Sequence, residues 1–204
     1  MFLDPYEFPF AATLEANWQV IRAEMEALEQ DRFTNWQGTY YKVEGKWTLF
    51  GFFLPGLRWE ENCARCPETT RILDAIPGAT MAGFSRLLAR SHIAPHHGEC
   101  GAVLRMHLAL TVPPGCRFRV GQETTAWCEG KTLLFDDTMQ HEAFNDSDLD
   151  RTVLIVDFYR PWRHRRSAWS FISDRAHYER RQRNAPAMRR LQAVTLGEGL
   201  KGES

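Results

Sequence analysis

A chain of 204 residues with 44% hydrophobic side chains is long enough to bury the core of one globular domain without disulfide or metal staples. Its formal net charge of −1 argues against a whole-protein basic footprint for nucleic acid or for an anionic membrane. The first ten residues carry Asp4 and Glu7 and no basic stretch, and no apolar run reaches the length of a membrane span. We therefore expect a cytoplasmic protein with no membrane partner.

The N-terminal region, residues 1–83, is predicted to hold helices and aromatic turns. Residues 11–30 predict an amphipathic helix, with Thr13 as a candidate cap and acidic side chains on the opposite face. The apolar side chains that recur at helical spacing are Leu14, Trp18, Ile21, Met25 and Leu28. Residues 36–54, with many aromatic side chains around glycines, predict short strands joined by turns. Residues 68–76, bounded by prolines, predict a second short helix.

The cysteines do not form the framework of a secreted domain. They are Cys63, Cys66, Cys100, Cys116 and Cys128, an odd number without regular spacing, which favours a reducing compartment. Cys63 and Cys66 make a CxxC, but a zinc site would need a second such pair, which the sequence lacks. Whether these two cysteines pair is left open.

Residues 84–162 are predicted to form the core of the fold. Strand patterns follow one another here, separated by glycine and proline, with no helical pattern between them. Such spacing is typical of an antiparallel sandwich or barrel and not of a doubly wound sheet. We predict a mainly β fold with a jelly-roll core, flanked by N-terminal helices and a C-terminal helical tail, in a single domain over residues 1–204.

Alternation within two of these strands places charged side chains on one face. In residues 104–112 every even position is apolar, so Arg105 and His107 share the other face. In residues 151–158 the odd face carries Val153, Ile155 and Asp157 behind Arg151 at its head. An arginine on such a face is costly to bury unless an anion meets it.

The tail, residues 163–204, is strongly basic in its first part. Nine arginines crowd residues 163–190, where Asp174 and Glu179 are the acidic side chains. Part of it is predicted to be helical and residues 197–204 to fray. The arginines form either a solvated face that packs on the body or a binding surface for an acidic partner or RNA.

Two histidines in short runs of unusual composition suggest a metal that holds an anionic co-substrate. His96 follows Ile93-Ala94-Pro95, and His141 closes the run 135–141. Non-heme Fe(II) oxygenases use two histidines and a carboxylate two residues after the first, but here that position is Gly98. Asp137, four residues before His141, could help through a loop or a water.

At these residues the chain resembles the aspartyl/asparaginyl β-hydroxylases, Fe(II)- and 2-oxoglutarate-dependent oxygenases with a double-stranded β-helix core. The resemblance covers residues 68–162, and its motifs follow in order. They are Ile93-Ala94-Pro95-His96, Leu104-Arg105-Met106-His107-Leu108, Glu123-Thr124 with Trp127 and Gly130-Lys131, Phe135-Asp136-Asp137 before His141-Glu142, and Arg151 with Ile155-Val156-Asp157 and Pro161. We expect Trp127 itself to serve packing more than substrate recognition.

The resemblance implies a role for each of these residues. His96 and His141 would be the iron ligands, with Asp137 as an outer acceptor for a water that completes the site. The co-substrate 2-oxoglutarate would place its C1 carboxylate against Arg105 and His107. Its C5 carboxylate would then lie against Arg151 and Ser85.

The expected activity is that of a dioxygenase. It would use O2, Fe(II) and 2-oxoglutarate to hydroxylate an unactivated C–H bond with release of succinate and CO2, and ascorbate would serve as an activator in vitro. A cupin-like isomerase or sensor, using His141 with Asn145, is one alternative. A non-catalytic module that binds through the basic tail is the other. Arg105 and Arg151 favour the oxygenase, because neither alternative needs them.

The expected substrate is a small molecule or a peptide: a free amino acid, or an aspartyl or asparaginyl residue. A lipid acyl chain ranks last, because the sequence lacks a membrane segment. Vertebrate peptide-modifying members carry an arginine two positions before Arg105, where this chain has Val103. That departure argues against an acidic peptide.

Overall fold

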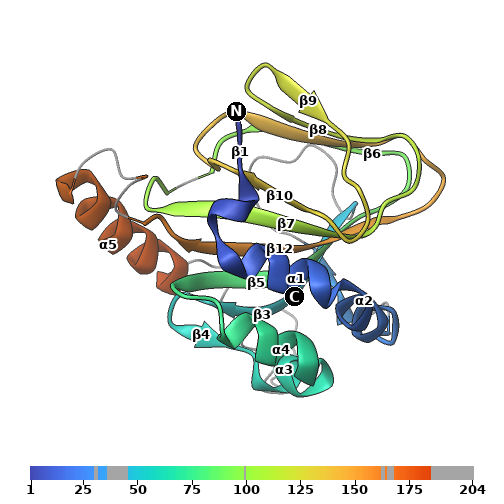
Figure 1. Ribbon diagram of the computed structural model, residues 1–204, viewed down its shortest axis with the longest axis horizontal. Coiled ribbons are helices and arrows are strands. Elements are labelled where there is room, and N and C mark those ends of the chain that lie inside the picture. The colour runs from blue at the N-terminus through green and yellow to red at the C-terminus, as the bar shows by residue number, and fades with distance from the viewer. Residues whose placement is uncertain (30–31, 36–45, 99, 162–163, 165–167, 185–204) are drawn as a thin grey trace, which may run out of the picture.

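Two antiparallel sheets face each other in the computed structural model (Figure 1), which describes residues 1–29, 32–35, 46–98, 100–161, 164 and 168–184. The large sheet has the order β1 (Phe2–Leu3), β10 (Thr132–Phe135), β7 (Val103–Thr111), β12 (Arg151–Tyr159), β5 (Ala79–Leu87), β3 (Trp47–Leu54) and β2 (Thr34–Asn35), with β4 (Leu57–Arg58) paired to β3. The small sheet has the order β6 (Ser91–His96), β11 (His141–Asn145), β8 (Cys116–Val120) and β9 (Glu123–Thr125). This is the predicted mainly β, jelly-roll architecture.

The large sheet has two buried faces, and the period-two alternation of β7 and β12 separates them. Leu104, Met106 and Leu108 pack beneath the helices, together with the even positions of β12. Ala109 and Val153 point the other way, into the space between the two sheets. The predicted faces of both strands are therefore confirmed. The charged positions of β7 and β12 lie on the face that looks toward the small sheet.

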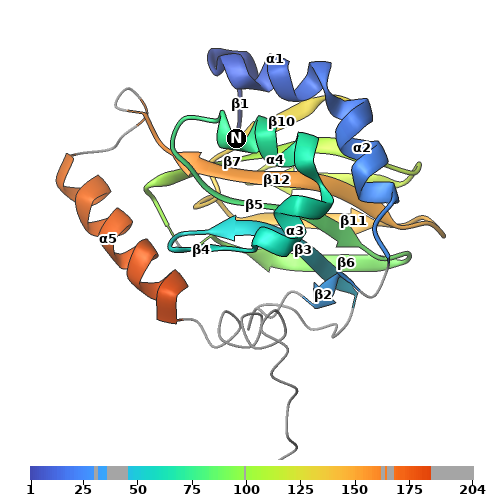
Figure 2. The same ribbon diagram turned by 90° about the horizontal axis from the view of Figure 1, so that it is seen from below.

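Helices cover the outer face of the large sheet (Figure 2). A 3-10 turn (Pro5–Glu7) leads into α1 (Pro9–Ala16) and α2 (Trp18–Glu26), and α3 (Glu60–Arg65) precedes α4 (Pro67–Asp74). The prediction of one helix over residues 11–30 is wrong, because Asn17 interrupts it. The side-chain amide of Asn17 donates to the Thr13 carbonyl at 2.8 Å and closes α1, while its backbone φ of −110° leaves the helical range.

The remaining predictions for the N-terminal region are met in part. The helix predicted over residues 68–76 is α4, whereas α3 was not predicted. The large sheet also recruits β3 from the region before residue 83. Much of the predicted aromatic-turn stretch, residues 36–45, lies outside the described residues. All five cysteines are free thiols, so Cys63 and Cys66 are not paired.

The C-terminal helix α5 (Ala168–Asn184) packs across one end of the sheets. Its Phe171 is buried against Cys100, Ala102 and Val103, with Tyr159 at the edge of the cluster. The tail is thus helical where described, and the predicted frayed end, residues 197–204, lies beyond the described residues. No helix in the described part of the chain combines the length and apolar character needed to cross a membrane.

Candidate functional site

His96 and His141 stand side by side on neighbouring strands of the small sheet. They are opposite each other in the β6–β11 register, and their ring centroids lie 4.1 Å apart. The Nδ1 of His96 contacts the Ala94 carbonyl at 2.8 Å, and that of His141 contacts the Met139 carbonyl at 2.8 Å. Because a carbonyl only accepts, each Nδ1 carries the proton. Each Nε2 is then the nitrogen with a lone pair that could bind a metal. Metal-binding histidines commonly donate their other ring N–H to a carbonyl in this way.

Both rings are held in the neutral form that metal binding requires. Burial lowers the pKa of His141 to about 3, and the neighbouring His96 ring adds to the effect. Burial likewise lowers the pKa of His96 below its ordinary value, although the contact with the Ala94 carbonyl opposes it. A proton therefore does not compete for either Nε2 at neutral pH.

Asp137 fills the space that a residue-98 side chain would need. Asp137 is 3% exposed, and its Oδ1 lies 3.4 Å from Nε2 of His141. A Cβ at Gly98 would lie 1.6 Å from Oδ2 of Asp137. The missing carboxylate at position 98 and the presence of Asp137 are thus one feature, because the two side chains cannot occupy the same volume. Among the described residues, no three His, Cys, Asp or Glu side chains form a metal-binding set.

Arg105 joins Asp137 to a second buried carboxylate, that of Asp157. The Nε and Nη2 of Arg105 donate to the two carboxylate oxygens of Asp157 at 2.6 and 2.8 Å. Its Nη1 lies 2.8 Å from Oδ1 of Asp137. A continuous polar chain therefore runs from β12 through β7 to His141. Alternation had placed Asp157 on this face, but its pairing with Arg105 depends on the β7–β12 register, in which the two residues are opposite each other.

A second polar region lies deeper between the sheets, around Arg151 and His107. Arg151 is 2% exposed, and its side chain has neither a hydrogen bond nor an ion pair among the described residues. Its guanidinium carbon lies 4.6 Å from the centroid of the Trp127 ring. Burial lowers the pKa of Arg151 to about 10. The Nε2 of His107 is also buried without a partner, and burial together with Arg151 and Arg105 lowers the pKa of His107 well below its ordinary value.

Ser85 lies near this region but has a partner. Its hydroxyl accepts a hydrogen bond from Nε1 of Trp47 at 2.7 Å. Ser85 is opposite Val153 in the β5–β12 register, two residues along from Arg151. A hydroxyl that accepts from an indole still has its own proton to donate. The structure thus places Ser85, Arg151 and His107 on the inner face of the large sheet and His96 and His141 on the small sheet.

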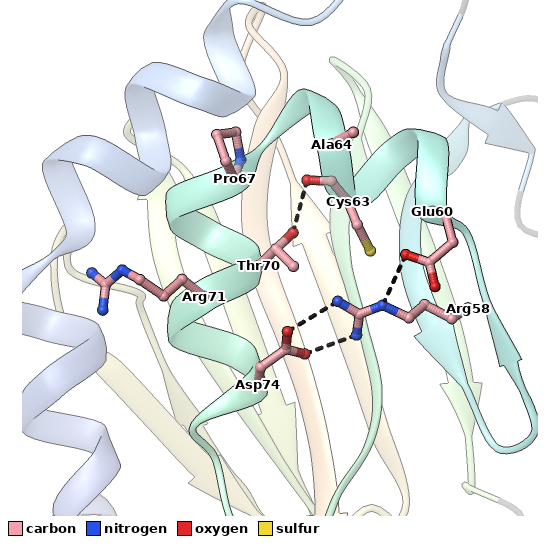
Figure 3. A pocket seen from close by; sticks show the side chains of 8 residues that line it. All are labelled: Arg58, Glu60, Cys63, Ala64, Pro67, Thr70, Arg71 and Asp74. Atoms are coloured by element: carbon pink, nitrogen blue, oxygen red, sulfur yellow. Dashed lines mark hydrogen bonds and ion pairs between the residues drawn. The ribbon is translucent and has the colours of Figure 1, made fainter.

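Two other features are accounted for without a functional role. Asn145 donates to the carbonyls of Leu87, Leu88 and Leu149 at 2.8 to 3.0 Å, so its amide holds a loop and does not accompany His141 as in the cupin-like alternative. A hollow of about 460 Å³ lies between α3 and α4 (Figure 3). Within this hollow the guanidinium of Arg58 donates two hydrogen bonds, of 2.8 and 3.0 Å, to the carboxylate of Asp74. The charges of these two lining residues therefore neutralise each other.

Comparison with known proteins gives a family for the chain. The family described as aspartyl/asparaginyl β-hydroxylase matches residues 15–161. An ornithine lipid ester-linked acyl 2-hydroxylase of Rhizobium tropici is 38% identical over 168 residues, which is 78% of this chain and 60% of that protein. The human aspartyl/asparaginyl β-hydroxylase is 34% identical over 158 residues, 73% of this chain and 21% of that protein. The chain therefore spans less than two thirds of either relative.

Among solved structures, a cupin domain of Schizosaccharomyces pombe Cnp3 has a TM-score of 0.43 at 7% identity, over 67% of this chain and 72% of that one.

Proposed function

Because the chain belongs to the aspartyl/asparaginyl β-hydroxylase family, we propose that it is an Fe(II)- and 2-oxoglutarate-dependent dioxygenase. It would hydroxylate an unactivated C–H bond of an amino acid, or of an aspartyl or asparaginyl residue in a peptide. The observation that carries the proposal is the pairing of two sites in one interior. Two neutral imidazoles, each with its proton on Nδ1, lie on the small sheet, and the unpaired buried guanidinium of Arg151 lies on the large one.

The donor set fits the proposed metal. Two imidazole nitrogens with buried carboxylate support suit Fe(II), and they leave positions open for other ligands. His96 and His141 would hold the ion, and Asp137 would accept a hydrogen bond from a water that completes the set. Bound Fe(II), with O2 and 2-oxoglutarate, would supply the oxidising chemistry and yield succinate and CO2.

The buried polar side chains of this interior fit a dicarboxylate. Arg151 would bind the C5 carboxylate with its planar fork, and Ser85 would donate its hydroxyl proton to the same group. His107 and Arg105 would meet the C1 carboxylate. Arg105 can do so through Nη1, which it shares with Asp137 at 2.8 Å. Co-substrate binding would therefore compete with Asp137 for this donor.

The aromatic walls of the interior would keep the chemistry dry. Phe118 packs against Trp127 and Phe135 at centroid distances of 5.1 and 4.9 Å, and Phe135 lies 5.3 Å from His141. These rings exclude water and strengthen every charge contact among them.

The relatives make a lipid acyl chain the second candidate substrate. The relative from Rhizobium tropici is named for hydroxylating such a chain. Val103, where vertebrate peptide-modifying members carry an arginine, is 1% exposed beneath α5 and brings no positive charge to the site. A lipid acyl group needs no such charge.

The test is succinate release with an oxygen-gain readout. The protein is incubated with Fe(II), ascorbate and 2-oxoglutarate, and free amino acids, aspartyl or asparaginyl peptides and ornithine lipids are supplied in separate arms. Mass spectrometry should find one added oxygen in one arm, coupled to succinate. Absence of 2-oxoglutarate turnover in every arm, from protein shown to bind Fe(II), would contradict the proposal. A cupin-like isomerase or a binding module would give that result.

A further inference from the structure

Trp127 contacts His107 and Arg151, the two side chains that each bury one nitrogen without a hydrogen-bond partner among the described residues. It lies in the loop between β9 and β10 and is 5% exposed. Its ring lies 6.2 Å from the His107 ring, at an interplanar angle of 26°, and 4.6 Å from the guanidinium carbon of Arg151. Phe118 backs the indole at 5.1 Å. A single side chain therefore touches two residues that come from different strands.

The contact with His107 determines where the imidazole carries its proton. Nε1 of Trp127 donates to Nδ1 of His107 at 3.4 Å. An indole N–H can only donate, so Nδ1 must offer its lone pair. The neutral ring then carries its proton on Nε2, and this is the nitrogen that is buried without a partner. A buried, unmatched N–H donor costs free energy until an acceptor reaches it.

The contact with Arg151 holds a charge without neutralising it. The guanidinium lies over the indole at a distance typical of cation–π pairs. An aromatic face attracts a cation but carries no net charge, whereas a carboxylate would cancel it. Arg151 consequently keeps its charge and its N–H donors for an incoming anion.

We propose that Trp127 is a positioning residue that presents His107 as an Nε2–H donor and Arg151 as an unpaired fork, so that together they receive a dicarboxylate. The identity of that anion rests on the proposed function, whereas the tautomer of His107 does not. In the described structure Trp127 has no ring contact or hydrogen bond with His96 or His141, the two histidines proposed to bind the metal. Its proposed role is therefore separate from metal binding.

The first test is the tautomer itself. Long-range proton–nitrogen NMR spectra of the 15N-histidine-labelled protein, assigned with a His107→Gln variant, should show His107 in a single Nε2–H form. The Trp127→Phe variant keeps an aromatic face but loses the donor, and should show a mixture of tautomers. Trp59→Phe is the matched control, because Trp59 is equally buried at 4% exposure in the same cluster; it should leave the spectrum unchanged.

The second test is binding of 2-oxoglutarate to the Zn(II)-loaded protein by calorimetry. We expect Kd to rise roughly tenfold in Trp127→Phe, the equivalent of one charge-assisted or oriented hydrogen bond. Trp127→Leu, which also removes the aromatic face, should raise it further. Trp59→Phe should bind as the wild type does.

The outcomes separate the two levels of the argument. An Nδ1–H form of His107 in the wild type would overturn the proposal whether or not any variant folds. An unchanged tautomer and an unchanged Kd in Trp127→Phe would overturn it as well. Dependence of the tautomer on Trp127, in a protein that binds no 2-oxoglutarate, would support the positioning role and count against the proposed function.

Discussion

Replacing Arg151 by Met should stabilise the protein that has no ligand. Burial lowers the pKa of Arg151 from its ordinary 12.5 to about 10. A lowered pKa in a base means that folding disfavours the charged form, so the cost is present at every pH below the folded-state value, neutral pH included. At about 1.4 kcal/mol per pH unit, the charge costs the folded state roughly 3 kcal/mol.

Part of that gain is offset by the loss of the contact with Trp127. A desolvated cation–π pair contributes about 1 to 2 kcal/mol. Met fills a similar volume and needs no anion, as in other replacements of buried charges by apolar side chains. The net expectation is that the free energy of unfolding rises by about 1 to 2 kcal/mol.

The same substitution should remove most of the stabilisation by 2-oxoglutarate, the proposed co-substrate. At a concentration about 100 times its Kd, a ligand stabilises the wild type by about 2.7 kcal/mol. Loss of a buried charge partner typically costs about 2 to 5 kcal/mol of binding. A loss of about 2.7 kcal/mol within that range raises Kd roughly a hundredfold. At that concentration the variant would gain about 0.4 kcal/mol.

Urea denaturation with and without 2-oxoglutarate, on Zn(II)-loaded and metal-free protein, measures both effects. Arg71→Met is the matched control, because Arg71 is 64% exposed on α4 and should change stability by less than about 0.5 kcal/mol. The reasoning is refuted if Arg151→Met destabilises the ligand-free protein and 2-oxoglutarate still stabilises the variant as it does the wild type.

Three further substitutions test the surroundings of the site. Asp157→Asn should destabilise the protein by about 3 kcal/mol in urea, because it removes the charge that the buried guanidinium of Arg105 meets. Asp148→Asn, in an exposed ion pair with Arg90, should cost under about 1 kcal/mol. Equal costs would contradict a stabilising role for the buried Arg105–Asp157 pair. Gly98→Ala should cost about 1 to 3 kcal/mol by overpacking, and combining it with Asp137→Ala should recover part of that loss; strict additivity in the double-mutant cycle would argue against the clash. Burial would raise the pKa of Asp136, but hydrogen bonds from Arg160 and Thr138 outweigh burial and hold this pKa below 3.8. The difference in unfolding free energy between wild type and Asp136→Asn should therefore be constant above pH 5 and shrink as the pH falls through the folded-state pKa. A difference that does not change with pH would contradict this.

Alternation in the sequence predicted the inner face of the large sheet, because side chains of a strand alternate whatever the neighbouring strands do. Arg105, His107 and Arg151 accordingly lie on the inner face of β7 and β12. That alternation does not predict which strands are neighbours in the sheet. The Arg105–Asp157 pair arises from the register between strands about 50 residues apart in the sequence, as the separation of 52 shows. Local patterns carry no information about such a register.

Two local features were not predicted from the sequence, for different reasons. The apolar spacing of α1 and α2 continues across Asn17, because Leu14 and Ile21 both pack on the same sheet. The break between the helices comes from the hydrogen bond of the Asn17 side chain to the Thr13 carbonyl. The spacing of apolar residues contains no signal for such a bond. Trp127 lies in a loop with no period at all, so its contacts with His107 and Arg151 could be found only in the folded chain.

Anaerobic addition of 2-oxoglutarate to the Fe(II)-loaded protein tests the central claim most directly. Chelation of the 2-oxo acid to Fe(II) held by His96 and His141 should produce a visible metal-to-ligand charge-transfer absorption that saturates with one equivalent of co-substrate. His96→Ala should lose it, and Arg151→Met should require far more 2-oxoglutarate to reach the same absorption. A wild-type protein that binds Fe(II) but shows no such absorption would contradict the assignment of this site to a 2-oxoglutarate-dependent dioxygenase.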